Sequence, residues 1–321
     1  MPRRKIGQLD WTDAGLAERR NRRVEALEGL SRLVDWTRFD ALLSGIHTAR
    51  KGEASYPPLM MFKVLLLQRW YGLSDPAMEA ALSDSLSFMA FAGLSLRDAT
   101  PDHTTIWRFR QELSKDGLLE RLLGELNSQL ESHAVVVKQG TLIDASIVSS
   151  AARRPRVEEG KVSPVDPDAR FGTTNERGRY AFGYKLHVAV DAGSGLVRAA
   201  KVTPANEQEI STAPQLLERA AGTVYADRGY DSDGLRRELA RRGLGDGVMR
   251  RRRGRDLTEA ETERNHQLSL KRRPVEALFG TMKRSYRMGR MRAFGLVRAT
   301  IDLVLFCIAF NLRRWLVLAT P

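Results

Sequence analysis

The sequence contains one cysteine in 321 residues. A single thiol cannot form an internal disulfide, and it cannot supply a zinc site built from cysteines. This residue, Cys307, stands in an apolar run at 303–310, where we expect it to belong to the core.

The sequence also lacks an uninterrupted apolar run long enough to cross a membrane. Its most apolar segment, 301–319, is interrupted by Asn311, Arg313 and Arg314. The charged start at residues 1–5 is not followed by an apolar stretch of signal-peptide length. We therefore expect a protein of the reducing cytoplasm with no membrane partner.

The sequence has fewer acidic than basic residues. Lys and Arg number 52 against 39 for Asp and Glu, which gives a net charge of +13. Such a balance favours a polyanionic partner, nucleic acid first, although some basic proteins simply carry a solvated basic surface. Hydrophobic residues make up 42% of the chain, enough to fill a core, so a disordered chain is excluded.

The region at 1–135 has the patterns of helices, and we expect it to bind DNA and support dimerisation. An apolar run at 59–67 follows two prolines, and Ser74 is a cap residue for the next helix. A third, basic helix near 104–113 presents Arg108 and Arg110 as candidate DNA contacts. This order is typical of a helix-turn-helix, but an ordinary helical bundle explains it equally well. Trp107 has the spacing of a core residue.

From about residue 138 the pattern changes to strands. Three β-rich segments come first, at 140–148, 184–191 and 196–203, with a hairpin turn between the last two. Helices and strands then alternate, at 207–220, 223–227, 232–242 and 247–249. This order predicts a mixed α/β domain.

We place this catalytic domain at 136–295, with a loop insert at 150–181 that is rich in charge, Gly and Pro. The remaining residues, 296–321, are expected to form a helix that packs on the core.

Four consecutive arginines follow the last predicted strand. They are Arg250, Arg251, Arg252 and Arg253. Their guanidiniums repel one another unless a polyanion is present, so we predict contacts with the DNA backbone.

Three carboxylates stand where a metal site would place them. Asp144 lies within the first predicted strand, where a charge is costly unless it faces a ligand. Asp227 ends a short strand, and strand ends are where sites form in open sheets. Glu276 follows Pro274 on a predicted helix and shares one face with Gly280 and Lys283. Taken singly, each has a simpler interpretation as a cap, a turn or a solvated helix residue.

The chemistry of phosphodiesters suits such acids. Two divalent cations about 4 Å apart stabilise the entering and the leaving oxygen. Magnesium and manganese prefer oxygen ligands, so the site needs carboxylates that converge in space.

Seven segments of the chain resemble a known family. They lie at 104–110, 142–146, 183–191, 203–206, 226–230, 272–283 and 309–314. In the sharpest, Arg272, Glu276 and Lys283 fit the family spacing of Tyr, two residues, Arg, three residues, Glu, six residues and Lys. Ser269 stands where the family has its tyrosine. The chain resembles bacterial insertion-sequence DDE transposases with a ribonuclease-H-like catalytic domain, in the group related to insertion sequence five.

The resemblance implies an enzyme that binds double-stranded DNA at the terminal inverted repeats of its element and at a target. Asp144, Asp227 and Glu276 would hold two Mg²⁺ ions, for which Mn²⁺ can substitute, and Arg272 and Lys283 would hold DNA phosphates. Water would cut the element's end to free a 3′-hydroxyl, which would join target DNA by transesterification. A homodimer or higher oligomer on DNA, associated with the nucleoid, is also implied.

Two rival functions stay open, a catalytically silent DNA-binding relic or regulator and a metal-dependent nuclease of the same fold. Other polar residues have simpler interpretations. His187 is expected to be structural, because magnesium seldom binds imidazole. Glu209 is a possible extra acid of the site, but its simpler interpretation is a first-turn helix residue favoured by the dipole. The sequence indicates no role for Asp166 and Asp168.

Overall fold

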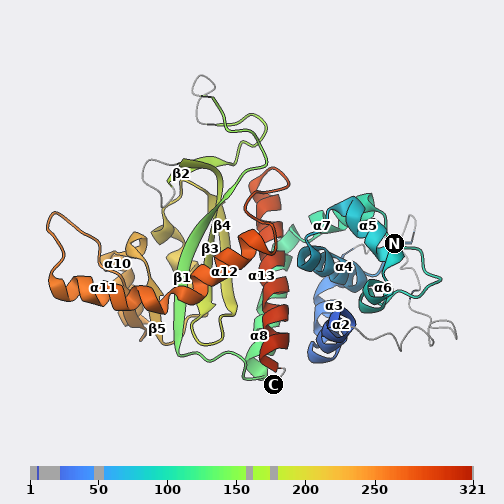
Figure 1. The fold of residues 1–321 in the computed structure, drawn as a ribbon, viewed down its shortest axis with the longest axis horizontal. Coiled ribbons are helices and arrows are strands. Elements are labelled where there is room, and N and C mark those ends of the chain that lie inside the picture. Colours follow the sequence, from blue (N-terminus) through green and yellow to red (C-terminus); the bar gives the residue numbers. More distant parts are fainter. Residues whose placement is uncertain (1–5, 7–21, 47–53, 157–161, 174–179, 320–321) are drawn as a thin grey trace. The chain divides into compact units, whose positions relative to one another are not determined.

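The computed structural model describes residues 6, 22–46, 54–156, 162–173 and 180–319 (Figure 1). The chain divides into two compact units. The first, or helical unit, contains residues 1–132 and 304–321, and the second, or sheet unit, contains residues 133–303. Among the described residues, we find no helix with the length and apolar character that a membrane crossing requires.

The helical unit is built around one apolar helix. Its helices are α2 (Arg22–Leu33), α3 (Trp36–Leu43), α4 (Pro58–Tyr71), α5 (Asp75–Asp84), α6 (Leu86–Ala92), α7 (His103–Glu112), the short η1 (Lys115–Gly117), α8 (Leu118–Ser132) and the later part of α13 (Leu296–Ala319). Helix α4 is buried along most of its length, and its Phe62 stacks on Phe39 at 5.7 Å between ring centroids. The Trp70 indole donates to the Ala309 carbonyl oxygen at 2.7 Å, which joins α4 to α13.

Cap residues fix where these helices begin, as the sequence predicts. The Ser74 hydroxyl accepts from the Ala77 amide, and Asp102 accepts from the Thr105 amide at 2.7 Å. Each satisfies an amide that has no partner within its helix. The expectation of a core position for Trp107 is wrong, because this side chain is 44% exposed on α7.

The sheet unit has a six-stranded mixed sheet. The strands are β1 (Gly140–Ser149), β2 (Arg170–Thr173), β3 (Tyr180–Asp191), β4 (Val197–Pro204), β5 (Thr223–Ala226) and β6 (Gly245–Val248). Strand β3 pairs antiparallel with β1, β2 and β4, and β5 pairs parallel with β1 and β6. The predicted mixed α/β class is confirmed, and these strand directions agree with a ribonuclease-H-like domain.

Helices and short turns connect and cover these strands. They are η3 (Glu209–Thr212), α9 (Ala213–Leu216), η4 (Arg228–Tyr230), α10 (Asp233–Arg241), α11 (Glu259–Lys271), α12 (Arg273–Arg284) and the start of α13. Helix α12 packs against β1. The core between strands and helices contains Ile143, Val224 and Leu216.

Three elements differ from the sequence prediction. The helix expected at 207–220 is only a 3₁₀ turn and a single α-turn, and Pro214, which has no amide to bond back to Ile210, stands at the junction of the two. Strand β2 lies inside the predicted loop insert. Helix α11 was not predicted, although Thr258 and Glu261 form a capping box at its start.

The Asp166 and Asp168 pair has a structural role. Asp166 is fully buried, and it accepts hydrogen bonds from the hydroxyls of Ser150 and Tyr184 and from the Gly295 amide. Asp168 accepts from the Leu296 amide at 2.9 Å. The two carboxylates therefore satisfy amides at the start of α13 and fix the base of the loop insert.

Candidate active site

The pairing of β1 with β5 brings the two predicted aspartates together. Leu142 is the register partner of Tyr225 in this parallel pair. Asp144 and Asp227 each stand two residues further along, so they emerge on the same side of neighbouring strands. Asp227 follows the end of β5, and its carboxylate accepts from the Gly229 amide at 2.8 Å at the start of η4.

Asp144 is held in an ion pair. Its side chain is 13% exposed, and Arg272 Nη2 lies 2.7 Å from Asp144 Oδ2. Burial and, to a smaller extent, the negative charge of Asp227 raise the pKa of Asp144 to about 6, against the opposing charge of Arg272. A carboxyl in this setting is stabilised as an anion by any added cation.

Arg272 stands where two helices meet. It follows α11 and precedes α12, and it caps both. Its Nε is buried and has no hydrogen-bond partner, while its Nη1 contacts Met249 Sδ at 3.8 Å. The phosphate contact expected for Arg272 stays a prediction, since here its guanidinium pairs with Asp144.

Glu276 lies one helical turn beyond Arg272. The Glu276 amide donates to the Arg272 carbonyl oxygen at 3.4 Å, and the Glu276 side chain is exposed. Lys283 is exposed further along α12, and partial burial lowers its pKa. Gly280 lies under the Arg284 guanidinium, since a Cβ there would lie 2.8 Å from Arg284 Nη2.

Glu209 joins the two aspartates, contrary to the simple helix role expected for it. A Cβ built on Gly229 would lie 2.6 Å from Glu209 Oε2 and 3.0 Å from Asp227 Oδ1, so both carboxylates border the same point. Burial, together with the charges of Asp227 and Asp144 and against the opposing charge of Lys185, raises the pKa of Glu209 to about 7. The sequence marks Glu209 as a possible extra acid but cannot place it beside Asp227, because η3 reaches the site only after the chain turns out of β4.

Tyr230 is buried beside the acids of the site. Its ring is fully buried, and its hydroxyl has no hydrogen-bond partner. Burial raises the pKa of Tyr230 well above its usual value, and the charges of Glu209, Asp144 and Asp227 add to the effect. The hydroxyl therefore lies within electrostatic range of all three acids.

His187 has the structural role that the sequence favours. Its Nε2 lies 2.9 Å from Thr203 Oγ1, and its Nδ1 lies 3.2 Å from Thr212 Oγ1. Burial lowers the pKa of His187 to about 3, so the ring is neutral at physiological pH.

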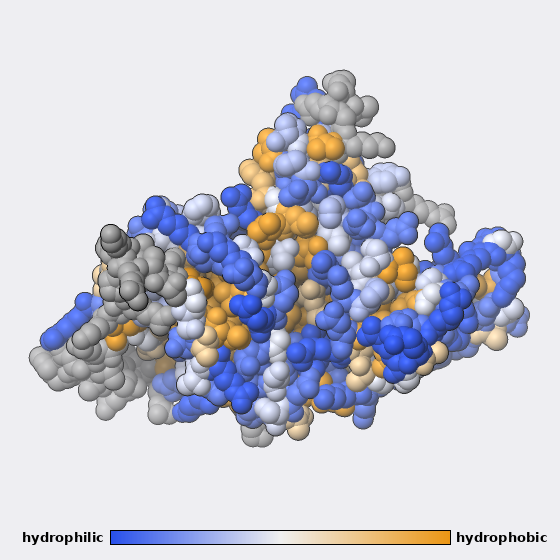
Figure 2. All heavy atoms as spheres, turned by 180° about the vertical axis from the view of Figure 1, so that it is seen from behind, coloured by the Kyte–Doolittle hydropathy of each residue, from blue (hydrophilic) through white to orange (hydrophobic). Residues whose placement is uncertain are grey.

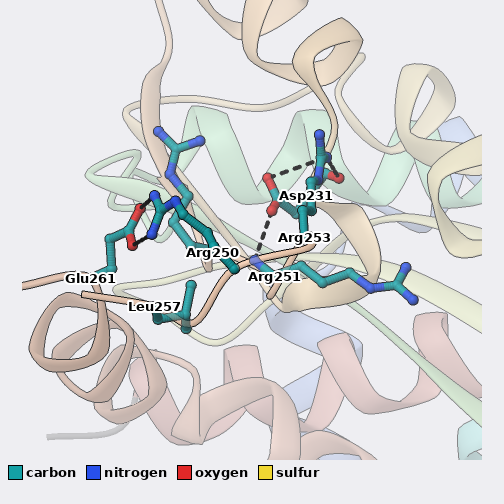
Figure 3. A pocket seen from close by; sticks show the side chains of 7 residues that line it. Asp231, Arg250, Arg251, Arg253, Leu257 and Glu261 are labelled. Carbon is teal, nitrogen blue, oxygen red and sulfur yellow. Dashed lines mark hydrogen bonds and ion pairs between the residues drawn. The ribbon is translucent and has the colours of Figure 1, made fainter. Parts of the chain in front are cut away.

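The arginine run borders a cavity of about 210 Å³ (Figure 3). The lining residues are Asp231, Arg250, Arg251, Arg253, Arg255, Leu257 and Glu261. Asp231 binds two residues of the arginine run. Its carboxylate accepts a hydrogen bond from the Arg251 amide at 2.7 Å, and its carbonyl oxygen accepts one from the Arg253 guanidinium. Arg252 pairs with Asp256 at 2.9 Å.

The two arginines predicted on α7 differ in their surroundings. Arg108 is exposed, next to exposed Trp107. Arg110 is half-buried, and its guanidinium donates to Asp75 and to Gln68 Oε1. Arg110 therefore has an internal partner in the helical unit. Figure 2 shows that hydrophilic side chains predominate on the face drawn there, with apolar side chains in smaller patches.

Two aspartates on neighbouring parallel strands, Asp144 within β1 and Asp227 just after β5, with more acids and cations around them, suit a metal-dependent enzyme of phosphodiester chemistry. Comparison with family models then identifies which one. Residues 137–312 match the model described as Transposase DDE domain, and residues 16–112 match Transposase domain (DUF772). The chain belongs to the DDE transposases, which are metal-dependent enzymes that act on DNA. The narrower group related to insertion sequence five stays a prediction.

The structure is also similar to a solved transposase. This is a cryo-EM structure of the piggyBac transposase synaptic complex with hairpin DNA, at 9% sequence identity and a TM-score of 0.40. The likeness covers 90% of this chain and 74% of that one.

The residues present fit a divalent cation. The donors are carboxylate oxygens, which suit Mg²⁺ or Mn²⁺, and an unpartnered buried hydroxyl lies near them. Among the described residues, no three Asp, Glu, His or Cys side chains yet converge on one point as metal ligands do. Arg272 holds Asp144, and Lys185 lies 3.7 Å from Glu209. These two cations partly neutralise the acids.

Proposed function

We propose that this DDE transposase binds the terminal inverted repeats of its element, cuts phosphodiesters to free 3′-hydroxyls and joins them to target DNA. The observation that carries the proposal is the β1–β5 register, which brings Asp144 and Asp227 to one edge of the sheet. Burial and the repulsion between the two carboxylates destabilise their charged forms, so a bound cation would stabilise both.

The proposed metal ligands are Asp144, Asp227 and Glu276, and the proposed ions are two Mg²⁺, with Mn²⁺ as a substitute. When bound, two such ions stabilise the attacking and the leaving oxygen of an in-line displacement. Glu276 is supported by its place on α12, one turn beyond the arginine that pairs with Asp144. Its exposed side chain is free to turn toward the aspartates or toward DNA.

The chemistry proceeds by two displacements at phosphorus. In the first, water attacks, the bond from phosphorus to the 3′-oxygen breaks, and that oxygen leaves as a 3′-hydroxyl. In the second, this hydroxyl attacks a target phosphodiester and displaces another 3′-oxygen. The second step makes one phosphodiester bond for each that it breaks, so no energy-rich cofactor is required.

The proposed DNA contacts come from both units. In the sheet unit they are Arg250, Arg251, Arg252, Arg253, Arg272 and Lys283, and in the helical unit Arg108. Exposed arginines next to a cavity suit phosphate oxygens, which guanidinium groups bind in pairs. Arg110 and Arg272 both have internal partners, so each would contact DNA only where a phosphate replaces that partner. We further propose a dimer or higher oligomer, because two ends of one element must be held together.

A strand-transfer assay tests the proposal. Purified protein, Mg²⁺ and DNA carrying the element's ends should give products joined to target DNA. The Asp227→Ala variant should bind the same DNA and give no cut or joined product. Cleavage without joining would identify a nuclease, and binding without cleavage a regulator. Wild-type cutting by Asp227→Ala would remove the assignment of the site.

A further inference from the structure

We infer that Glu209 is a fourth carboxylate of the metal site, a ligand that faces Lys185 while no metal is bound. The inference rests on the proposed metal-binding role of Asp144 and Asp227 and adds one residue to it. Its basis is the place of the Glu209 side chain, its anchoring, and an unpartnered hydroxyl beside it.

The backbone that carries Glu209 is firmly anchored. The Thr212 hydroxyl donates to the Glu209 carbonyl oxygen at 2.9 Å, and the same hydroxyl lies 3.2 Å from His187 Nδ1. Lys185 donates to the Glu207 carbonyl oxygen at 2.8 Å. The turn η3 is thus fixed to β3 by two side chains, so the position of Glu209 does not depend on a free loop.

The Glu209 carboxylate and the Asp227 carboxylate share one small space above Gly229. Both oxygens lie within about 3 Å of the point where a Cβ on Gly229 would stand, at 2.6 Å and 3.0 Å. Only a glycine at 229 leaves this space open, because any side chain would meet both acids. Two carboxylates that face one open point are a natural place for a cation.

A second observation points to a ligand there. The Tyr230 hydroxyl is wholly buried without a hydrogen-bond partner, and the charges of Glu209, Asp144 and Asp227 all reach it. A buried hydroxyl without a partner is costly. A water molecule on a bound cation, placed among these acids, would donate a hydrogen bond to this hydroxyl oxygen and give it the partner that the protein does not supply.

The balance of charge agrees with this inference. Three carboxylates, Asp144, Asp227 and Glu209, face two cationic groups, Arg272 and Lys185. Lys185 lies 3.7 Å from Glu209 Oε1, at the outer limit of an ion pair, while it bonds directly to the Glu207 carbonyl oxygen. Glu209 can therefore exchange a weak contact with Lys185 for a divalent cation without moving the backbone.

Direct measurement of metal binding tests this inference without reference to activity. Mn²⁺ binding to the full-length protein is measured by calorimetry and by electron paramagnetic resonance of the free ion. Glu209→Gln should weaken the tightest binding by about tenfold or more. Glu209→Asp keeps the charge, so its Mn²⁺ affinity should lie between that of the unchanged protein and that of Glu209→Gln. The matched control is Glu207→Gln, two residues away and exposed, which should bind Mn²⁺ as the unchanged protein does.

The possible outcomes separate this inference from the proposed function. Wild-type binding by Glu209→Gln, together with loss of binding by Asp227→Asn, would overturn the role of Glu209 and leave the proposed function intact. Wild-type binding by Asp227→Asn would overturn the proposed site itself. Equal weakening by Glu207→Gln and Glu209→Gln would show a general effect of surface charge and would also overturn the role of Glu209. Thermal unfolding in a chelator identifies any variant that does not fold.

Discussion

The acids of the strands and the acid of the helix are held in different ways. Asp144 and Asp227 are placed by strand register, and Asp144 is shielded from water and locked to Arg272. Glu276 is exposed on α12, and its place follows from how that helix packs on β1. The comparison teaches that the strand side of the site is built before any ligand arrives, while the helix side is left free to adjust.

The cleavage rate should fall to a similar extent whether a strand carboxylate or the helix carboxylate is removed. Asp144→Asn and Glu276→Gln should each lower the cleavage rate by about 10³-fold or more, because each removes several kcal/mol of metal-dependent stabilisation. Single-turnover cleavage of end DNA measures both. Glu276→Gln should leave the free energy of unfolding within about 0.5 kcal/mol, as for an exposed side chain. Full activity in Glu276→Gln would place the helix side outside the site.

The free energy of unfolding should respond strongly to changes on the strand side of the site and weakly to changes at Glu276. Arg272→Met leaves Asp144 buried without its partner and should cost about 3 kcal/mol at pH 7. Urea unfolding in a chelator measures the loss. The double variant Arg272→Met with Asp144→Asn should recover most of it, since no uncompensated charge then remains. An equal loss in the double variant would assign the effect to packing of the arginine stem.

The pH dependence of stability should belong to the buried acids. The pKa values of Asp144 and Glu209 are raised to about 6 and about 7, so the folded protein holds these protons more tightly than the unfolded chain. Their contribution is complete below about pH 4 and is lost as the pH rises through about 7, a change of at most about 6 kcal/mol for the two groups together. Thermal unfolding of the metal-free protein between pH 5 and 8 measures it. Asp144→Asn should flatten the profile, and Glu276→Gln should not.

The smallest effect is expected at the outer end of α12. Lys283→Ala removes one predicted phosphate contact, so DNA binding should weaken a few-fold and the slope of log K against log salt should decrease by about 1. Fluorescence anisotropy with end DNA at several salt concentrations measures the slope. An unchanged slope would show that Lys283 does not contact phosphate.

Much of the strand side could be predicted from the sequence. A carboxylate within a strand and another at a strand end mark Asp144 and Asp227, because each is costly there without a ligand. Glu209 could not be predicted in this way, since its place depends on where η3 lies after the chain leaves β4. The ion pair of Arg272 with Asp144 depends on how α12 packs on β1, which local patterns do not give. Pro214, by contrast, was a readable signal that the helix at 207–220 would be short.

The pairing of Leu142 with Tyr225 determines on which face of the sheet the two aspartates emerge. Successive residues of a strand point to opposite faces, so Asp144 and Asp227 meet because both stand the same number of residues beyond the Leu142–Tyr225 pair. Deleting one residue within β5 would turn the following carboxylate to the other face. Deleting two would restore the face but set the carboxylate about 6.6 Å away from Asp144 along the strand, so the active site depends on the length of β5 as well as on its register.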